Sequence, residues 1–527
     1  MFIPASLSHT SAAFKPQPAG PSLQGPRRLS SAQRPVKELL PQITSGEAVQ
    51  TSKLPRKNPK SAREAAVLQL ERISSQGTYI HIGKRADVTE AGKPPVNGRL
   101  EVDARAQKSA TGLVAGVLKS QRRLDHLLSP FLAKPEGLAP GLLNLLRLGA
   151  YELLVFNKPG RIVNEYVQLA KQLSHSRAGG FVNAVLRKVT QLQEAQVWQQ
   201  PLQLDAAASL SDQLGLYYSH PSWMVQRWLQ QFGQVETIDL LCANNRLPEY
   251  GIRVSPGVEG GPQGLLEDLQ VRLPAEVEVS ASEYLPDYFL HTVRGLQDMI
   301  SMPQFKAGQM QVMSESAGMV VRLLDPQPGE RILDACAAPG SKTLFAASLM
   351  QGKGQIVALD SKAARLKLLE SAARKQGLSS MIHPVACQLQ DLQQQHPELI
   401  PLGGFDTVLV DAPCSGTGTL AKRADLRWQR LPDDLSDLCT LQATLLDAAA
   451  ALVRMRGFLV YSTCSIEDDE DEAQILSFLQ RHTNFKAVPS QATCLPQSVI
   501  SSDGFLRIFQ HRHGIEGAFA AVLQREQ

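Results

Sequence analysis

The sequence of 527 residues lacks any uninterrupted run of about eighteen apolar residues, the length that a membrane-spanning helix requires. Its richest apolar stretch, LLNLLRLGAYELLVF, is interrupted by Arg147 and Glu152 and predicts a buried helix instead. We therefore expect no membrane span. Because a chain of this length exceeds what one hydrophobic core accommodates, it should fold as several domains.

Cysteine is sparse, with no C-x-x-C pair and no tight cluster with histidine. The seven cysteines are Cys242, Cys336, Cys387, Cys414, Cys439, Cys464 and Cys494. A zinc site and a disulfide framework are both disfavoured, and a reducing compartment suits the chain better. Those that we interpret as small buried apolar side chains are Cys242, Cys387, Cys439 and Cys494.

Acidic residues are scarce in the first 58 residues, which contain eight Lys or Arg but only Glu38 and Glu47. This Ser- and Pro-rich segment without an apolar centre is typical of an organellar transit peptide, with a disordered tail as the alternative. It contributes +6 to a whole-chain charge of +4, which leaves the remainder near −2. Overall charge therefore does not argue for nucleic acid, and any RNA site must be a local patch.

Three patterns follow this segment and predict three domains. Residues 59–195 repeat apolar side chains at three- and four-residue steps and predict an all-α domain. Residues 196–303 predict a small α+β connector, and residues 304–527 alternate strands with helices, as in a Rossmann-like α/β domain whose ligands bind beyond the strand ends. Basic residues of the helical domain that either face RNA phosphates or lie on solvated helix faces are Lys119, Arg122, Arg123, Arg177, Arg187 and Lys188.

The stretch DACAAPGSKT, residues 334–343, lies between a predicted strand and a predicted helix. A phosphate-binding P-loop would need glycine at Cys336 and Ser341, and G-x-G-x-x-G is absent as well. What remains is a tight turn of small residues, where backbone approaches a ligand closely. Asp360 ends the next predicted strand, where a carboxylate accepts both hydroxyls of a ribose; a helix-capping role is the alternative.

Two further strand ends carry cysteines, Cys414 in VDAPCSG beside Asp411, and Cys464 in YSTCS. Carbon 5 of a pyrimidine is too weak a nucleophile to take a methyl group from a sulfonium donor directly. It becomes reactive when a thiolate adds to the neighbouring carbon and an acid supports the charge at N3. Two thiols and one carboxylate permit this reaction, and the residues alone leave open which thiol attacks.

These motifs resemble those of RNA cytosine-5 methyltransferases that use S-adenosylmethionine. DACAAPGSKT is similar to the family's D-x-C-A-A-P-G-G-K-T, DAPCSGTG to D-A-P-C-S-G/A-x-G, and YSTCSIEDDEDE to Y-x-T-C-S-x-x-x-x-E-N-E. Upstream, LRLGAYELL, VNEYVQLAKQL and GGFVNAVLRKV resemble the NusB-like RNA-binding domain of the bacterial Sun/RsmB type, a small-subunit rRNA methyltransferase. With the transit-like segment, this implies an organelle with bacterial-type ribosomes, a chloroplast before a mitochondrion or the cytoplasm.

The resemblance implies a role for each matching residue. Cys464 would be the nucleophile, Cys414 would assist product release, and Asp411 would contact the target base. DNA cytosine methyltransferases reverse the two thiol roles. Residues implied to bind S-adenosylmethionine are Cys336, Ala337, Ala338, Pro339, Gly340, Ser341, Lys342, Asp360, Asp391 and Asp411. Asp391 lacks the adjacent glycine of the family pattern.

Three positions depart from the family pattern. Ser341 replaces a loop glycine, Asp471 stands where Asn is usual, and Ser255 stands where the connector motif usually has Asn. None of these removes a residue that the chemistry requires. We therefore predict S-adenosylmethionine-dependent methylation of carbon 5 of an unpaired or extruded cytosine in 16S-type rRNA, through a covalent cysteine adduct, by a monomer without metal or membrane. The alternatives are a non-catalytic rRNA-binding or assembly factor, and the same chemistry on tRNA or large-subunit rRNA.

Overall fold

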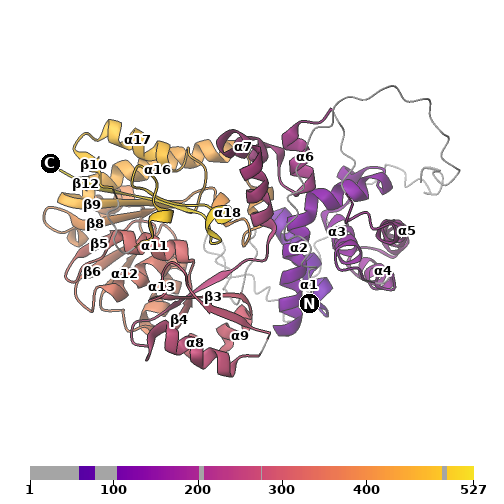
Figure 1. Ribbon diagram of the computed structural model, residues 1–527, viewed down its shortest axis with the longest axis horizontal. Coiled ribbons are helices and arrows are strands. Elements are labelled where there is room, and N and C mark those ends of the chain that lie inside the picture. Colours follow the sequence, from indigo (N-terminus) through magenta and orange to yellow (C-terminus); the bar gives the residue numbers. More distant parts are fainter. Residues whose placement is uncertain are drawn as a thin grey trace.

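The computed structural model describes residues 59–76, 104–158, 160–200, 207–274, 276–489 and 495–526. The predicted transit segment, residues 1–58, lies outside the described residues. Figure 1 shows a helical part at one end, an α/β part at the other, and helix α7 (Ser222–Asn245) between them. The predicted fold class, an all-α domain followed by a connector and a Rossmann-like domain, is confirmed.

The helical part is built around α3, whose side chains are buried on almost every face. Its helices are α1 (Ala62–Gln76), α2 (Ala104–Leu128), α3 (Pro140–Leu154), α4 (Ile162–Leu173) and α5 (Ser176–Glu194), with 3-10 turns η3 (Ser129–Phe131) and η4 (Pro135–Gly137). The two charges that interrupt the apolar run of α3 are paired, Arg147 with Asp125 at 2.7 Å and Glu152 with Arg63 at 2.6 Å. Pairing allows a charge to lie in a hydrophobic core.

The connector combines α6 (Leu210–Tyr217) and α7 with an antiparallel sheet of order β2-β3-β1-β4. Its remaining elements are β1 (Tyr250–Val254), α8 (Gly261–Arg272), β2 (Glu278–Ala281), β3 (Phe289–Arg294), α9 (Leu296–Ser301), α10 (Pro303–Lys306) and β4 (Met310–Val312). Strand β4 lies beyond residue 303, and it pairs with β1 from Ile252 to Val254. The sheet therefore takes its last strand from past the predicted division at residues 303 and 304.

The C-terminal part is an eight-stranded sheet with the order β10-β12-β9-β8-β5-β6-β7, in which β11 pairs with β12. Its strands are β5 (Arg331–Asp334), β6 (Gln355–Leu359), β7 (Ile382–Val385), β8 (Phe405–Asp411), β9 (Val453–Thr463), β10 (Phe485–Ala487), β11 (Leu506–Ile508) and β12 (Ala518–Arg525). Strands β5 to β9 pair in parallel, and their order reverses between β5 and β8. Ligands of open α/β sheets bind at such a reversal, beyond the carboxyl ends of the strands.

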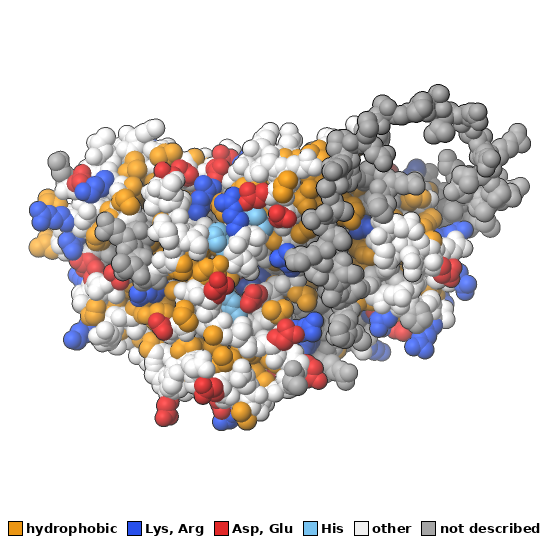
Figure 2. Space-filling view, viewed as in Figure 1, with side chains coloured by type: hydrophobic (Ala, Val, Ile, Leu, Met, Phe, Trp, Pro, Cys, Tyr) orange, Lys and Arg blue, Asp and Glu red, His pale blue; other side chains and the backbone are white. Residues whose placement is uncertain are grey.

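Helices cover both faces of this sheet (Figure 1). They are α11 (Glu315–Leu324), α12 (Ser341–Leu349), α13 (Ala363–Lys375), α14 (Leu392–Gln395), α15 (Leu426–Gln429), α16 (Pro432–Leu452), α17 (Glu472–Arg481) and α18 (Gln510–His513), with 3-10 turns η5 (Leu389–Asp391), η6 (Pro397–Leu399), η7 (Thr417–Thr419) and η8 (Gln497–Val499). Among the described helices, α16 alone is long and apolar enough to cross a membrane by composition. Its apolar side chains, including Leu445, Leu446 and Ala449, pack in the core beside β8 and β9, so we read it as a core helix. The face shown in Figure 2 intersperses basic and acidic side chains over its described part, as the small net charge leads one to expect.

The three parts meet around one segment of the C-terminal part, residues 420–430. Arg427 is fully buried, and its guanidinium donates to Ser219 O at 3.2 Å, Asn245 Oδ1 at 2.9 Å and Asn244 O at 3.1 Å. Burial lowers the pKa of Arg427 to about 9. The next residue, Trp428, donates from its indole to Leu118 O of α2 at 2.8 Å. One short segment therefore bonds to both the connector and the helical part.

This junction corrects part of the predicted RNA surface. Lys119 donates to Arg246 O at 2.5 Å, Arg122 donates to His220 O at 2.7 Å, and the Arg123 guanidinium lies 4.3 Å from the Trp198 ring centre. These three side chains are used in contacts within the protein, because α2 packs against the connector. The candidates that remain exposed on α5 are Arg177, Arg187 and Lys188.

Candidate active site

The sheet register brings three predicted site residues to one edge. Strands β8 and β9 are parallel neighbours in which Asp411 lies opposite Ser462. Cys414 follows Asp411 by three residues, and Cys464 directly follows the end of β9. Parallel neighbouring strands end at the same edge, so the two cysteine loops lie side by side.

The two thiols are in contact, since Cys414 Sγ and Cys464 Sγ are 3.3 Å apart. Cys464 is solvent-exposed, and Cys414 is half-buried. The hydrogen bond from Cys414 lowers the pKa of Cys464, and the nearby Lys342 ammonium acts in the same direction. The same hydrogen bond, together with burial, holds the pKa of Cys414 well above its ordinary value. These opposite shifts assign the shared proton to Cys414 and make Cys464 the sulfur that ionises first, which is the property required of a thiol nucleophile.

An ion pair lies beside these thiols. Lys342 Nζ is 2.7 Å from Asp411 Oδ2, and the hydroxyl of Ser462 donates to Asp411 Oδ1 at 2.9 Å. Burial opposes the charge on Lys342, but the adjacent Asp411 carboxylate raises the pKa of Lys342 overall. The edge thus holds an ammonium group, a carboxylate and a thiolate-forming sulfur next to one another.

The loop that follows β5 is tied to neighbouring strands. The amide of Ala337 donates to Leu359 O at 2.7 Å, and the φ of Gly340 is 106°, where an added Cβ would lie 2.4 Å from Leu369 Cδ1. Glycine is therefore required at Gly340 by both backbone conformation and space. Burial raises the pKa of Cys336, so this third thiol stays protonated and does not compete as a nucleophile.

Asp334, which the sequence analysis did not select, is the buried acid of this loop. Burial raises the pKa of Asp334 to about 7, and Thr343 donates its hydroxyl to Asp334 Oδ2 at 2.7 Å. Asp334 Oδ1 is buried without a hydrogen-bond partner among the described residues. Its place at the end of β5, before a loop of small residues, is the signal that identifies it.

The structure places Asp360 and Asp391 at the ends of β6 and β7. Asp360 accepts the Lys362 amide at 2.9 Å, pairs with Arg365 at 2.9 Å, and is nearly buried. Arg365 also donates to Ala338 O at 2.6 Å, which links Asp360 to the loop after β5. Because Lys362 is the N-cap residue of α13, this contact forms a local turn before the helix and does not cap it. A cofactor role for Asp360 stays a prediction. Asp391 lies half-buried on η5.

These groups fit S-adenosylmethionine, which carries an ammonium group and two ribose hydroxyls. Both are hydrogen-bond donors, and this edge offers the unpartnered Asp334 Oδ1 and the Asp360 carboxylate as acceptors. The tight turn from Cys336 to Gly340 exposes backbone rather than bulky side chains to a ligand.

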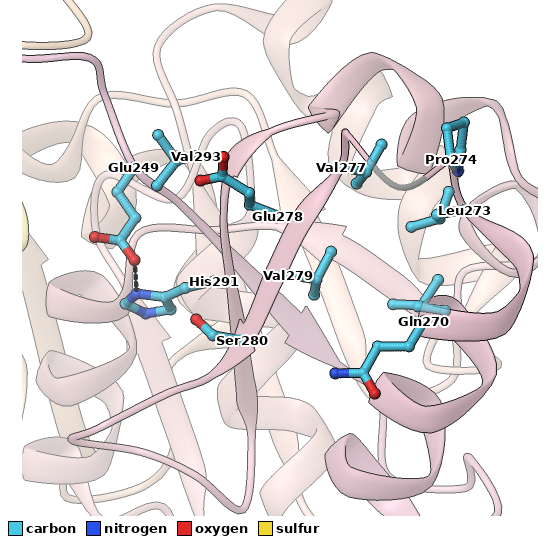
Figure 3. Close-up of a pocket in the computed structure, with 11 residues that line it drawn as sticks. Glu249, Gln270, Leu273, Pro274, Val277, Glu278, Val279, Ser280, His291 and Val293 are labelled. Carbon is cyan, nitrogen blue, oxygen red and sulfur yellow. Dashed lines mark hydrogen bonds and ion pairs between the residues drawn. The ribbon is translucent and has the colours of Figure 1, made fainter. Parts of the chain in front are cut away.

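A cavity of about 480 Å³ lies elsewhere, in the connector. Figure 3 shows His291 bonded to Glu249 on one side of it, and Gln270 of α8 with Leu273, the residue after α8, on another. Burial opposes protonation, but contacts of 2.8 Å to Glu249 and to Glu315 raise the pKa of His291 to about 9. These charges satisfy one another, and no thiol lines the cavity, so we do not assign methyl transfer to it.

The structure also shows the surroundings of the other cysteines and of two positions that depart from the family pattern, Asp471 and Ser255. Cys387 is buried, as expected of a small apolar side chain, whereas Cys242 and Cys439 are only half-buried; Cys494 lies outside the described residues. Asp471 is buried and accepts the Thr463 hydroxyl at 2.6 Å, the contact that an Asn oxygen would also make. Ser255 donates its hydroxyl to Gly308 O at 2.8 Å.

Fold and site together define the class of S-adenosylmethionine-dependent methyltransferases. The family model "16S rRNA methyltransferase RsmB/F" matches residues 321–524, and the NusB family model matches residues 60–191. A probable ribosomal RNA small subunit methyltransferase B of Synechocystis is 33% identical over 88% of this chain and 99% of its own length. The corresponding Bacillus subtilis protein is 32% identical over 79% of this chain and 90% of its own length. The chain belongs to the RsmB/F family of 16S rRNA methyltransferases.

Solved structures agree with this placement. The crystal structure of PH0851 is similar over 90% of this chain and 99% of its own, with a TM-score of 0.69 and 27% identity. NSun6 from Pyrococcus horikoshii, solved with SFG, shares the fold over 58% of this chain at 18% identity and a TM-score of 0.50.

Proposed function

We propose that the chain methylates carbon 5 of a cytosine in small-subunit rRNA through a covalent adduct with Cys464. The observation that carries this proposal is the 3.3 Å contact between the thiols of Cys414 and Cys464, beside the Lys342–Asp411 ion pair. Methylation of an oxygen or nitrogen would need no protein thiol, because the substrate atom attacks the methyl group directly. Two thiols, one with a lowered pKa and one with a raised pKa, suit a reaction in which a bond to sulfur must first form and then break.

In the attack step, the Cys464 thiolate adds to carbon 6 of the base. The electron pair of the ring double bond moves toward N3, where a proton from the Lys342–Asp411 pair neutralises it. Carbon 5 thereby becomes nucleophilic. Bound S-adenosylmethionine supplies the electrophilic methyl group that carbon 5 accepts. Asp411, held by Ser462, orients the base edge during this step.

Release requires loss of the carbon 5 proton and cleavage of the bond between sulfur and carbon 6. Once Cys464 is a thioether it carries no charge, so the hydrogen bond that raised the pKa of Cys414 is lost. The pKa of Cys414 then falls, so the thiol loses its proton to solvent and its thiolate accepts the carbon 5 proton. The electron pair of that C–H bond re-forms the ring double bond as Cys464 leaves as thiolate, and N3 returns its proton to the Lys342–Asp411 pair.

The test is methyl transfer from methyl-labelled S-adenosylmethionine to small-subunit rRNA transcripts, followed by bisulfite mapping of 5-methylcytosine. Wild-type protein should label one cytosine, and Cys464→Ala should not. Cys242→Ala, which removes a half-buried thiol on α7, is the matched control and should label normally. Labelling of tRNA or large-subunit rRNA instead, or rRNA binding without labelling, would replace the proposal with the corresponding alternative.

We also propose that residues 1–58 direct the protein to the chloroplast, and that the target cytosine is unpaired or extruded when a monomer acts on it. The low acid content of this segment supports targeting, and the burial of a base edge inside a stacked helix supports extrusion. Fusing residues 1–58 to a fluorescent protein tests the destination, with mitochondrial or cytoplasmic fluorescence as the contrary outcomes.

A further inference from the structure

One buried carboxylate bonds to both cysteine loops. Glu470 is fully buried and lies between Cys464 and helix α17. Its Oε1 accepts the backbone amide of Ser415 at 2.8 Å, and its Oε2 accepts the hydroxyls of Ser415 and Ser465, each at 2.5 Å. Ser415 directly follows Cys414, and Ser465 directly follows Cys464. The Glu470 side chain therefore joins the residues next to the two thiols.

The same carboxylate is fixed from behind. Gln442 of α16 donates to Glu470 Oε1 at 3.0 Å and to Pro413 O at 2.9 Å, and the Tyr461 hydroxyl donates to Glu470 O at 2.6 Å. A carboxylate has about four acceptor positions, and four donors occupy them here. Glu470 consequently has no free lone pair for proton transfer, and hydrogen bonds to a charged acceptor are about twice as strong as neutral ones.

Only a charged carboxylate can accept all four of these hydrogen bonds with one side chain. The backbone N–H of Ser415 and the side-chain NH₂ of Gln442 can only donate, and both reach Oε1. A glutamine at this position still offers one oxygen, but its NH₂ group forces both serine hydroxyls to turn and accept. The two loops would then lose the acceptor that they share at Oε2 without any loss of side-chain volume.

We propose that Glu470 is a positioning residue that sets the separation of the Cys414 and Cys464 sulfurs and thereby couples attack by one to release by the other. This inference rests on the thiol roles proposed above. A displacement of about 1 Å at a reacting group can slow a step by roughly 100-fold. Release is the step that such a displacement should slow most, because Cys414 must reach the base while Cys464 is still bonded to the base.

The experiment compares Glu470→Gln with Asp471→Asn. Asp471 is the neighbouring buried carboxylate, but it bonds to Thr463 and not to Ser415, so its change to an amide is the matched control. The first readout is the fraction of protein held as a covalent RNA adduct on a denaturing gel, against the rate of released 5-methylcytosine. The second is the affinity for phenylarsine oxide, which bridges two close thiols and needs no RNA or cofactor.

For Glu470→Gln we expect release to slow about 10- to 100-fold, adduct to accumulate, and arsenical affinity to fall. Asp471→Asn should match wild type in both readouts. A wild-type adduct fraction and unchanged arsenical affinity in Glu470→Gln would overturn the inference. If Glu470→Gln does not fold, Ser415→Ala and Ser465→Ala each remove one hydroxyl contact and must show the same trend, more weakly. Absence of 5-methylcytosine with wild-type protein would refute the proposed function, whereas the arsenical readout judges the positioning of the thiols separately.

Discussion

Replacing Cys414 with alanine should make Cys464 a poorer nucleophile at neutral pH. The two sulfurs are 3.3 Å apart, and the hydrogen bond from Cys414 is the largest cause of the lowered pKa of Cys464. Alanine removes this donor, so the pKa of Cys464 rises. Since only the thiolate attacks, the rate of adduct formation should then reach its maximum at higher pH.

The size of the effect follows from the contact. A hydrogen bond to a charged group is worth about 1.5–3 kcal/mol, and the lower value applies because Cys464 is solvent-exposed. A change of about 1.4 kcal/mol corresponds to about a tenfold change in rate. At pH 7 we therefore expect adduct to form about tenfold more slowly in Cys414→Ala than in wild type, although it should persist longer once formed.

The assay is rapid quenching of enzyme mixed with an rRNA fragment, with adduct measured on denaturing gels across the neutral and alkaline pH range. Cys242→Ala again serves as the thiol control. An unchanged pH profile for Cys414→Ala would show that Cys414 does not activate Cys464. Adduct formed by Cys464→Ala in place of Cys414→Ala would exchange the two roles.

Gly418→Ala should lower the free energy of unfolding by about 1–3 kcal/mol, because an added Cβ would lie 2.8 Å from the backbone oxygen of Cys464. The same contact should also lower the methylation rate. Arg427→Met should lower the free energy of unfolding by about 3 kcal/mol in denaturant titration, since it leaves buried carbonyl groups without a donor. Asp334 holds its proton to a pH of about 7 in the folded chain, against an ordinary pKa of 3.8. Stability should therefore fall as pH rises between these values, and Asp334→Asn should remove that slope in pH-dependent unfolding. Asp360→Ala should weaken S-adenosylmethionine binding about 10- to 100-fold in calorimetry, and equal affinity would refute its cofactor role.

The site residues were largely predictable because their positions follow from local patterns. Asp411, Cys414 and Cys464 follow apolar strands, and parallel strands place such residues at one edge of the sheet. The residues alone left open which thiol attacks, and only the family resemblance assigned attack to Cys464. The contact that favours this assignment joins residues fifty positions apart, and it shifts the pKa values of Cys414 and Cys464 in opposite directions. Glu470 lay within a recognised motif, but its partner Ser415 comes from another loop.

The contacts of Lys119, Arg122 and Arg123 were missed for a related reason. These residues were weighed either as an RNA surface or as solvated helix residues, because basic side chains on a helix are normally exposed. Their actual partners include backbone carbonyls such as Arg246 O and His220 O, and carbonyls leave no trace in a sequence pattern. Contacts between domains are therefore the part of the structure that could not be predicted from residue types.

These contacts between domains also reach the thiols. Arg430 donates to Ser415 O at 3.0 Å and to Cys414 O at 3.1 Å, and it lies two residues after Trp428, whose indole bonds to Leu118 O of the helical part. On the Cys464 side, Trp228 of α7 donates to Glu467 at 2.9 Å, in the loop that leads to Glu470. Both cysteine loops are thus joined by the shared carboxylate. The Cys464 side also bonds directly to α7, whereas the Cys414 side bonds to Arg430, whose neighbour Trp428 bonds to the helical part. Because these bonds are short and mostly buried, a displaced helical domain or connector would disturb the thiol spacing, whatever either contributes to RNA binding.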